Sequence, residues 1–75
     1  MNKNLLCIEI SKTDVYIEYT NRDIEYISFT KAKKTIFKTL PKKLKYSCVD
    51  SEKSVNFLNS LLTKYQLYNN KLVLK

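Results

Sequence analysis

The sequence predicts one small α+β domain over residues 1–75, in which a three-stranded antiparallel meander is followed by two or three helices and a short C-terminal strand. Three observations predict this class: period-two alternation of apolar residues before position 30, helical spacing of apolar residues after it, and renewed alternation at the C-terminus. Because 75 residues are too few to build two hydrophobic cores, a single domain is expected.

Three segments with strand-like alternation make up the expected meander. They are residues 4–10, 15–20 and 24–29, separated by polar turns of three or four residues. The chain contains no glycine, so its turns need other residues, and Asn21 is expected to take a left-handed conformation in the second turn. Residues 24–29 are apolar on both faces, which indicates a strand that is central in its sheet or receives a further strand.

The period becomes helical at Thr30, which is expected to cap a first helix that Pro41 ends near Leu40. The apolar stripe of this helix comprises Ala32, Ile36, Phe37 and Leu40. Its lysines are expected on the outward face.

Residues 41–49 fit either a short helix or an extended link, and the sequence leaves this open. A longer helix is expected over residues 50–67, with Asp50 or Ser51 as its cap and with Phe57 outside its apolar stripe. That stripe comprises Val55, Leu58, Leu61, Leu62 and Tyr65. Two consecutive asparagines at positions 69 and 70 then predict a turn before a short strand over residues 71–75.

Positive charge is concentrated in the middle of the chain. Fourteen Lys or Arg residues against seven Asp or Glu give a net charge of +7. Residues 26–45 hold seven lysines and no acid, whereas residues 1–25 hold three bases and five acids. Such a segment attracts phosphate backbones, anionic lipid or acidic polypeptide, and it is equally compatible with a solvated face.

The composition argues against most kinds of catalytic site. Without histidine the chain lacks Cys–His and Ser–His nucleophile systems and the usual zinc sites, and without glycine it lacks the glycine-rich phosphate loops. The generic candidates, Glu9 with Glu18 and Cys48 beside Lys45, fit solvent-facing and packing residues better. We therefore expect a protein that is not an enzyme and that needs no cofactor or metal.

The start of the chain, MNKNLLCIEI, becomes charged too soon for the apolar region of a signal peptide. No apolar run approaches the length that spans a membrane. A cytoplasmic protein with reduced cysteines and no membrane partner is expected, and a disulfide between Cys7 and Cys48 has no support.

The predicted order of elements is winged-helix-like, and two segments resemble the PqqD-like peptide-binding domains called RiPP recognition elements. In YISFTKAKKTIFKTL, Phe29-Thr30, Ala32 and Ile36-Phe37 occupy the places of that family's strand end, small residue and apolar pair. SVNFLNSLLTKYQLY is similar to the family's last helix. Together the two segments cover about half of the chain. The family's second helix has only PKKLKYSCV available, and its expected Asn and acid are Thr30 and Lys31 here.

The resemblance implies a non-catalytic module that binds the leader segment of a precursor peptide by adding it as a strand to the third-strand edge. The peptide-binding residues expected from it are Ile24, Tyr26 and Ser28 along the edge and Leu58, Leu62 and Tyr65 from the last helix. Electrostatic attraction of an acidic peptide or protein partner is expected from Lys31, Lys33, Lys34 and Lys38. Because a domain of this size is marginally stable alone, a homo-oligomer also fits.

Two other functions remain open. A winged-helix nucleic-acid binding protein would read bases through Asn56, Asn59 and Gln66 and contact phosphates through Lys53, Lys64 and Lys71. A small phage-type inhibitor that docks on one host protein fits the size and the Lys-, Asn- and Tyr-rich composition.

Overall fold

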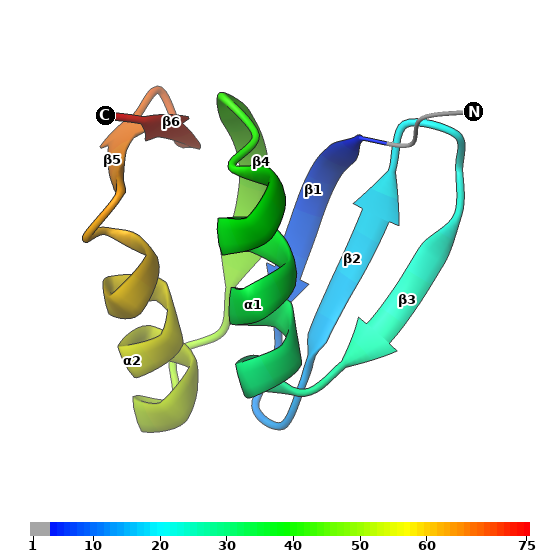
Figure 1. The fold of residues 1–75 in the computed structure, drawn as a ribbon. Helices are drawn as coiled ribbons and strands as arrows, with labels where there is room; N and C mark the ends of the chain where they lie inside the picture. Colours follow the sequence, from blue (N-terminus) through cyan, green and yellow to red (C-terminus); the bar gives the residue numbers. More distant parts are fainter. Residues whose placement is uncertain (1–3) are drawn as a thin grey trace.

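The computed structural model describes residues 4–75, and within them the chain forms six strands and two helices (Figure 1). The elements in chain order are β1 (Leu5–Ile10), β2 (Val15–Tyr19), β3 (Ile24–Ile27), α1 (Phe29–Thr39), β4 (Lys43–Cys48), α2 (Glu52–Leu61), β5 (Tyr65–Tyr68) and β6 (Lys71–Leu74). The strands form one sheet in the order β3-β2-β1-β4-β6-β5. The β1–β4 pair is parallel, and the other four pairs are antiparallel.

The protein is thus an α+β protein, but the expected meander followed by helices and one short terminal strand is wrong. β1, β2 and β3 do pair in antiparallel fashion, yet they form only half of a six-stranded mixed sheet. β4 lies between the two helices in the sequence, and the C-terminal hairpin joins the same sheet through β6. The C-terminal residues, which a winged-helix-like order of elements would use as a separate wing, are therefore part of the main sheet.

The segment left open by the sequence, residues 41–49, contains a strand and no helix. In β4, Leu44 is fully buried, Tyr46 and Cys48 are half-buried against the core, and the alternate residues are exposed. This period of two matches a strand with one covered face. The crossover through α1 places β4 beside β1 in parallel, which is the usual way a helix connects strands of one sheet.

Helix α1 begins two residues earlier than expected, because Ser28 rather than Thr30 is its N-cap. The Ser28 hydroxyl accepts a hydrogen bond from the Lys31 backbone N–H at 3.2 Å. The expected end of the helix before Pro41 is confirmed. Leu40 closes it in the left-handed region, with φ at 44°, and its N–H donates to the Ile36 carbonyl.

Helix α2 buries a face that only partly matches the expected stripe, because Leu61 is buried and Leu58 packs against the core as expected but Ser54 and Phe57 are buried in place of Val55. Its buried residues are Ser54, Phe57 and Leu61, whereas Val55 is exposed. Ser54 can be buried because its hydroxyl donates to the Ser11 carbonyl, which removes the cost of an unpaired polar group. The helix ends at Leu61, so the expected stretch through residue 67 is too long.

The turns show how a chain without glycine reverses direction. In the β2–β3 turn the left-handed residue is Arg22, with φ at 75°, and not Asn21 as expected. The β5–β6 turn at Asn69 and Asn70 is confirmed. Both residues have positive φ, at 50° and 61°, between the paired residues Tyr68 and Lys71, which is a two-residue type I′ hairpin.

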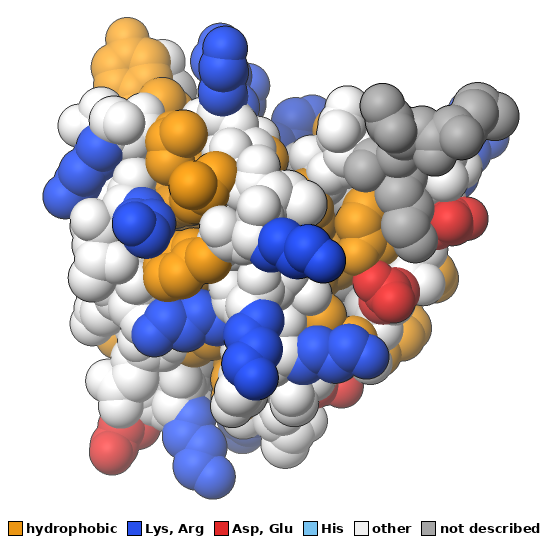
Figure 2. Space-filling view, in the orientation of Figure 1, with side chains coloured by type: hydrophobic (Ala, Val, Ile, Leu, Met, Phe, Trp, Pro, Cys, Tyr) orange, Lys and Arg blue, Asp and Glu red, His pale blue; other side chains and the backbone are white. Residues whose placement is uncertain are grey.

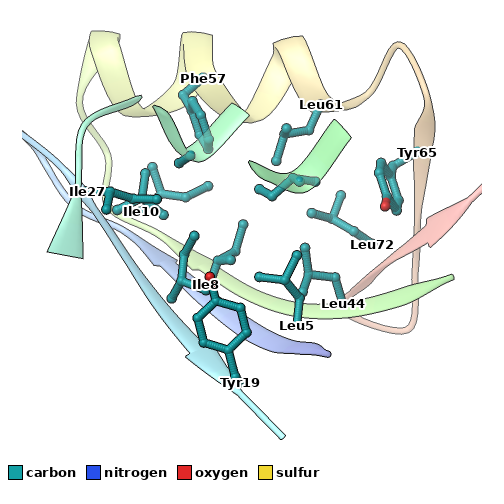
Figure 3. Packing of buried hydrophobic residues seen from close by; sticks show 14 residues of the cluster. Leu5, Ile8, Ile10, Tyr19, Ile27, Leu44, Phe57, Leu61, Tyr65 and Leu72 are labelled. Carbon is teal, nitrogen blue, oxygen red and sulfur yellow. The ribbon is translucent and has the colours of Figure 1, made fainter. Parts of the chain in front are cut away.

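Both helices pack on the same face of the sheet, and the core fills the space between them (Figures 1 and 3). Its buried hydrophobic residues are Leu5, Ile8, Ile10, Val15, Ile17, Tyr19, Ile27, Ala32, Ile36, Leu44, Phe57, Leu61, Tyr65 and Leu72. The Tyr65 hydroxyl donates to the Pro41 carbonyl at 2.6 Å and so ties β5 to the α1–β4 connection. Across residues 4–75, no helix has the length and apolar character needed to cross a lipid bilayer.

Candidate functional site

Strand β3 lies at one end of the sheet, so its side away from β2 is an outer edge. The Tyr19 N–H donates to the Asp23 carbonyl at 2.9 Å. This bond shows which of the alternating residue pairs between β2 and β3 are hydrogen-bonded. Because bonded and non-bonded pairs alternate in an antiparallel ladder, Glu25 and Ile27 bond to β2. The N–H and C=O groups of Ile24 and Tyr26 point to the outer side. We call these outward groups the β3 edge.

The side chains along the β3 edge are unusually exposed for their size. Ile24 is 51% exposed and Tyr26 is 67% exposed. The Tyr26 ring contacts the Tyr16 ring of the neighbouring strand edge-on, with centroids 5.3 Å apart. This contact holds one aromatic side chain of the edge in place while leaving most of its surface accessible.

Ser28, the third expected edge residue, has a different structural role. Its side chain caps α1, and its carbonyl accepts from the Ala32 N–H at 2.9 Å as the first bond of the helix. The edge therefore ends at Ile27, and a bound strand would have two outward residues, Ile24 and Tyr26, as its main-chain partners.

The helical half of the expected site is not assembled with the β3 edge. Tyr65 belongs to β5, at the opposite end of the sheet from β3, and is fully buried. Leu58 and Leu62 are half-buried and pack against the core from α2 and its C-cap. Ile24 and Tyr26 pair with Glu18 and Tyr16 on the face of the sheet that carries no helix, so they do not form one site with Leu58, Leu62 and Tyr65.

The four expected electrostatic residues lie on α1, and all of them are exposed: Lys31, Lys33, Lys34 and Lys38. Figure 2 shows Lys and Arg side chains spread over the helix-covered side of the molecule, around a smaller apolar area. The first turn of α1 contains no acidic residue, so no side chain there offsets the positive end of the helix dipole or the charge of Lys31. This end of α1 follows β3 directly.

A shallow hollow between the two helices was not foreseen from the sequence. It has a volume of about 310 Å³, and its lining residues are Phe29, Thr30, Lys33, Lys53, Asn56 and Phe57. The rings of Phe29 and Phe57 meet with centroids 5.3 Å apart. The sequence did not predict this contact because Phe57 was placed outside the apolar stripe of its helix and the two rings are 28 positions apart in the chain.

The other face of the sheet carries no helix in the described chain, and we call it the open face. Its strands present the residues that alternate with the buried ones, including Cys7, Glu9, Tyr16 and Glu18 on β1 and β2. The Glu18 carboxylate accepts hydrogen bonds from the Tyr16 hydroxyl at 3.3 Å and the Cys7 thiol at 3.6 Å. These contacts fix the position of a carboxylate on an exposed surface.

The two thiols lie on opposite faces of the sheet. Cys7 is on the open face, while Cys48 pairs in register with Ile10 and packs against the core, and both are free thiols. Burial and then the hydrogen bond to Glu18 raise the pKa of the Cys7 thiol, and burial and then Asp50 raise the pKa of Cys48. Both shifts favour the neutral thiol over the nucleophilic thiolate. Within residues 4–75, no cluster of three or more His, Cys, Asp or Glu side chains is arranged to hold a metal ion.

No protein-family model, no curated protein sequence and no solved structure matches this chain. In the position that the second helix of a PqqD-like domain requires, the chain forms strand β4.

Proposed function

We propose that this protein is a non-catalytic binding module that takes up an extended segment of an acidic partner as an additional strand along the β3 edge. The observation that carries the proposal is the exposure of Ile24 and Tyr26 on an outer strand whose alternate main-chain groups point away from the sheet. The main chain of an added strand hydrogen-bonds to such groups, and its side chains contact the surface on either side and give specificity.

The preference for an acidic partner rests on the charges next to the edge. Lys31 and the N-terminus of α1 follow β3 directly, and the first turn of α1 contains no acid. Carboxylates on the helix-facing side of an added strand are therefore attracted to this end of the site. Exposed ion pairs add little affinity each, so the lysines are expected to act mainly on the association rate.

The other end of the sheet offers a built-in comparison. In the β5–β6 ladder, Lys75 N–H donates to the Lys64 carbonyl, so by alternation Leu67 points its main-chain groups outward, as Tyr26 does on β3. Leu67 is 50% exposed. A proline at Leu67 therefore tests loss of an outward N–H at the edge that the proposal does not use.

The experiment starts from a randomised peptide library selected for binding to the full chain. One selected peptide, labelled with fluorescein, is then titrated by fluorescence polarisation against the wild type, Tyr26→Pro, Leu67→Pro and Tyr26→Ala, with folding checked by circular dichroism. Tyr26→Pro should weaken binding by about tenfold or more, because one main-chain hydrogen bond is lost and the ring blocks approach. Leu67→Pro should bind like the wild type.

Tyr26→Ala keeps the backbone N–H and should lose less affinity than Tyr26→Pro. N-methylation of successive peptide residues should weaken binding at every second position, because only alternate amides of an added strand face its neighbour. Equal binding by folded Tyr26→Pro and wild type, or an N-methyl pattern without alternation, would refute strand addition at the β3 edge.

The charge contribution is tested separately with Lys31→Glu and Lys34→Glu. Both should slow association with an acidic peptide in stopped-flow measurements, and the slowing should diminish at high salt. A parallel titration with single-stranded and duplex DNA and RNA examines the nucleic-acid alternative. Tight binding that falls steeply with salt would favour that alternative over the peptide.

A further inference from the structure

The open face has its charges divided into two halves. Glu9 and Glu18 lie on β1 and β2, while three lysines lie on β4 and β6. These lysines are Lys43, Lys45 and Lys71. The boundary between the halves is the β1–β4 pair, which is the centre of the six-stranded sheet.

The basic half holds like charges as direct neighbours. Lys45 and Lys71 are partners in the β4–β6 register, and Lys43 is paired with Val73 one step further along the same face. Like charges directly opposite each other destabilise a sheet. On the acidic half, Tyr16 and Cys7 hold the Glu18 carboxylate in place, as described above. The strands of the acidic half thus present no lysine on the open face, and the strands of the basic half present no carboxylate there, so neither half neutralises its own charge.

The outer strands of the open face carry large exposed side chains, with Gln66 as the polar neighbour of Tyr68 on β5. Ile24 and Tyr26 lie on β3, and Tyr68, which is 65% exposed, lies on β5 at the other end. Tyr68 and Val73 line a hollow of about 220 Å³ together with Lys43 and Lys71. From one end of the sheet to the other, the open face is therefore apolar on β3, acidic on β2 and β1, basic on β4 and β6, and occupied by Tyr68 and Gln66 on β5.

This order of properties is complementary to itself. A two-fold axis parallel to the strands, between β1 and β4 and above the open face, places β3 of one copy over β5 of the other. It also places the acidic β1–β2 half over the basic β4–β6 half, twice. Such an isologous contact repeats each favourable pairing by symmetry.

We propose that the open face is a homodimer interface, in which two sheets pack face to face and Glu9 and Glu18 of each copy meet the lysines of the other. Aligned packing of two twisted sheets about 10 Å apart is a common arrangement. Six strands about 4.8 Å apart and about four residues long cover only a small area, about 400 Å² per copy. The dimer is therefore a weak one that dissociates on dilution.

A second copy fits the open face better than a polyanion does. The face carries two carboxylates and three lysines, whereas the chain as a whole carries +7, so most of the excess positive charge lies elsewhere. A nucleic acid along the face would have to pass over Glu9 and Glu18. The mixed signs, divided at the centre, favour a partner with the same division.

The test uses two charge variants of the full chain, studied by sedimentation velocity. The acidic-face variant carries Lys43→Glu, Lys45→Glu and Lys71→Glu, and the basic-face variant carries Glu9→Lys and Glu18→Lys. The wild type should show a concentration-dependent monomer–dimer equilibrium. Each variant alone should be monomeric, and an equimolar mixture of the two should form a heterodimer, because uniformly acidic and uniformly basic faces complement each other.

A control variant carries Lys31→Glu, Lys34→Glu and Lys38→Glu on the helix-covered side, with the same change in net charge as the acidic-face variant. It should dimerise at least as well as the wild type. Circular dichroism checks folding, and Tyr68→Ala provides a milder variant that should weaken the dimer without changing any charge. None of these substitutions changes a residue of β3, so loss of the dimer and loss of peptide binding are distinguished by the variants, although both a second copy and a bound peptide would cover Ile24 and Tyr26.

Three results would overturn the proposal. The first is a wild type that stays monomeric at all accessible concentrations, and the second is folded charge variants that do not pair when mixed. The third is equal loss of dimer in the acidic-face and helix-side variants, which would reflect net charge alone. If the wild type stays monomeric but binds a single-stranded oligonucleotide that the acidic-face variant does not bind, the lysines serve a nucleic acid instead.

Discussion

The Tyr19 hydroxyl donates a hydrogen bond to the Glu25 carboxylate at 2.5 Å and so joins β2 to the edge strand β3 on the helix-covered side. Tyr19 is buried, and burial together with this hydrogen bond raises its pKa to about 12. The contact makes the attachment of β3 depend on a neutral phenol.

The stability of the protein should therefore fall at high pH. The folded state favours the protonated phenol, so the contribution is complete below the unfolded pKa of about 10 and is lost as the pH rises through about 12. Urea unfolding at several pH values across this window measures it. Tyr19→Phe removes this titration while leaving Tyr16 and Tyr65 unchanged, so its stability should decline less steeply. An equally steep decline in Tyr19→Phe would show that other groups cause the effect.

The start of α1 gives a second prediction. Ser28→Ala should lower the free energy of unfolding by about 1 kcal/mol, because the Lys31 N–H loses its capping acceptor. Thr30→Ala, which the sequence pattern would make the damaging change, should cost less than about 0.5 kcal/mol because Thr30 is exposed within the helix. Denaturant unfolding measures the free energy of unfolding of the two variants and so compares the contributions of Ser28 and Thr30. A larger loss for Thr30→Ala would place the cap where the sequence analysis expected it.

The packing of α2 gives a third prediction. Phe57→Ala should cost about 3 to 5 kcal/mol, and Val55→Ala, at an exposed helix position, less than about 0.5 kcal/mol. Because the larger loss can unfold a domain of this size, Phe57→Leu serves as a milder variant, and it should still cost more than Val55→Ala. A larger loss of stability for Val55→Ala than for Phe57→Leu in thermal or urea unfolding would show that Val55 belongs to the buried face of α2.

These elements also show how far the sequence predicts the fold. Clean alternation such as that of Val15–Tyr19 predicted strand β2 directly, and Asn69-Asn70 predicted the turn between β5 and β6. β4 was missed because its alternation is weak, with Leu44 the only strongly apolar residue at its centre, and the strand is defined by its pairing with β1 and β6. Such pairing between residues far apart in the chain leaves no local signal.

The phase of α2 could not be predicted for a related reason. Ser54 reads as polar and hence exposed, but its hydrogen bond to Ser11, 43 residues earlier, makes it a buried position. In the same helix Phe57 is buried and Val55 is exposed. At the candidate site, the sequence left open whether the strand at residues 24–29 is central or free to receive another strand, and β3 lies at the outer end of the sheet. The sequence could not show that Tyr65 belongs to the opposite end.

The β3 edge itself gives the last prediction, which needs no partner. In the ladder with β2, the amides of Glu25 and Ile27 are hydrogen-bonded and those of Ile24 and Tyr26 face outward. Hydrogen exchange followed by NMR on the labelled chain should show slow exchange at Glu25 and Ile27 and fast exchange at Ile24 and Tyr26. Addition of a peptide selected for binding should slow the Tyr26 amide while leaving Leu67 on β5 unchanged. Slow exchange at all four β3 amides in the free protein would mean that the edge is already covered, and strand addition would then require displacement of whatever covers it.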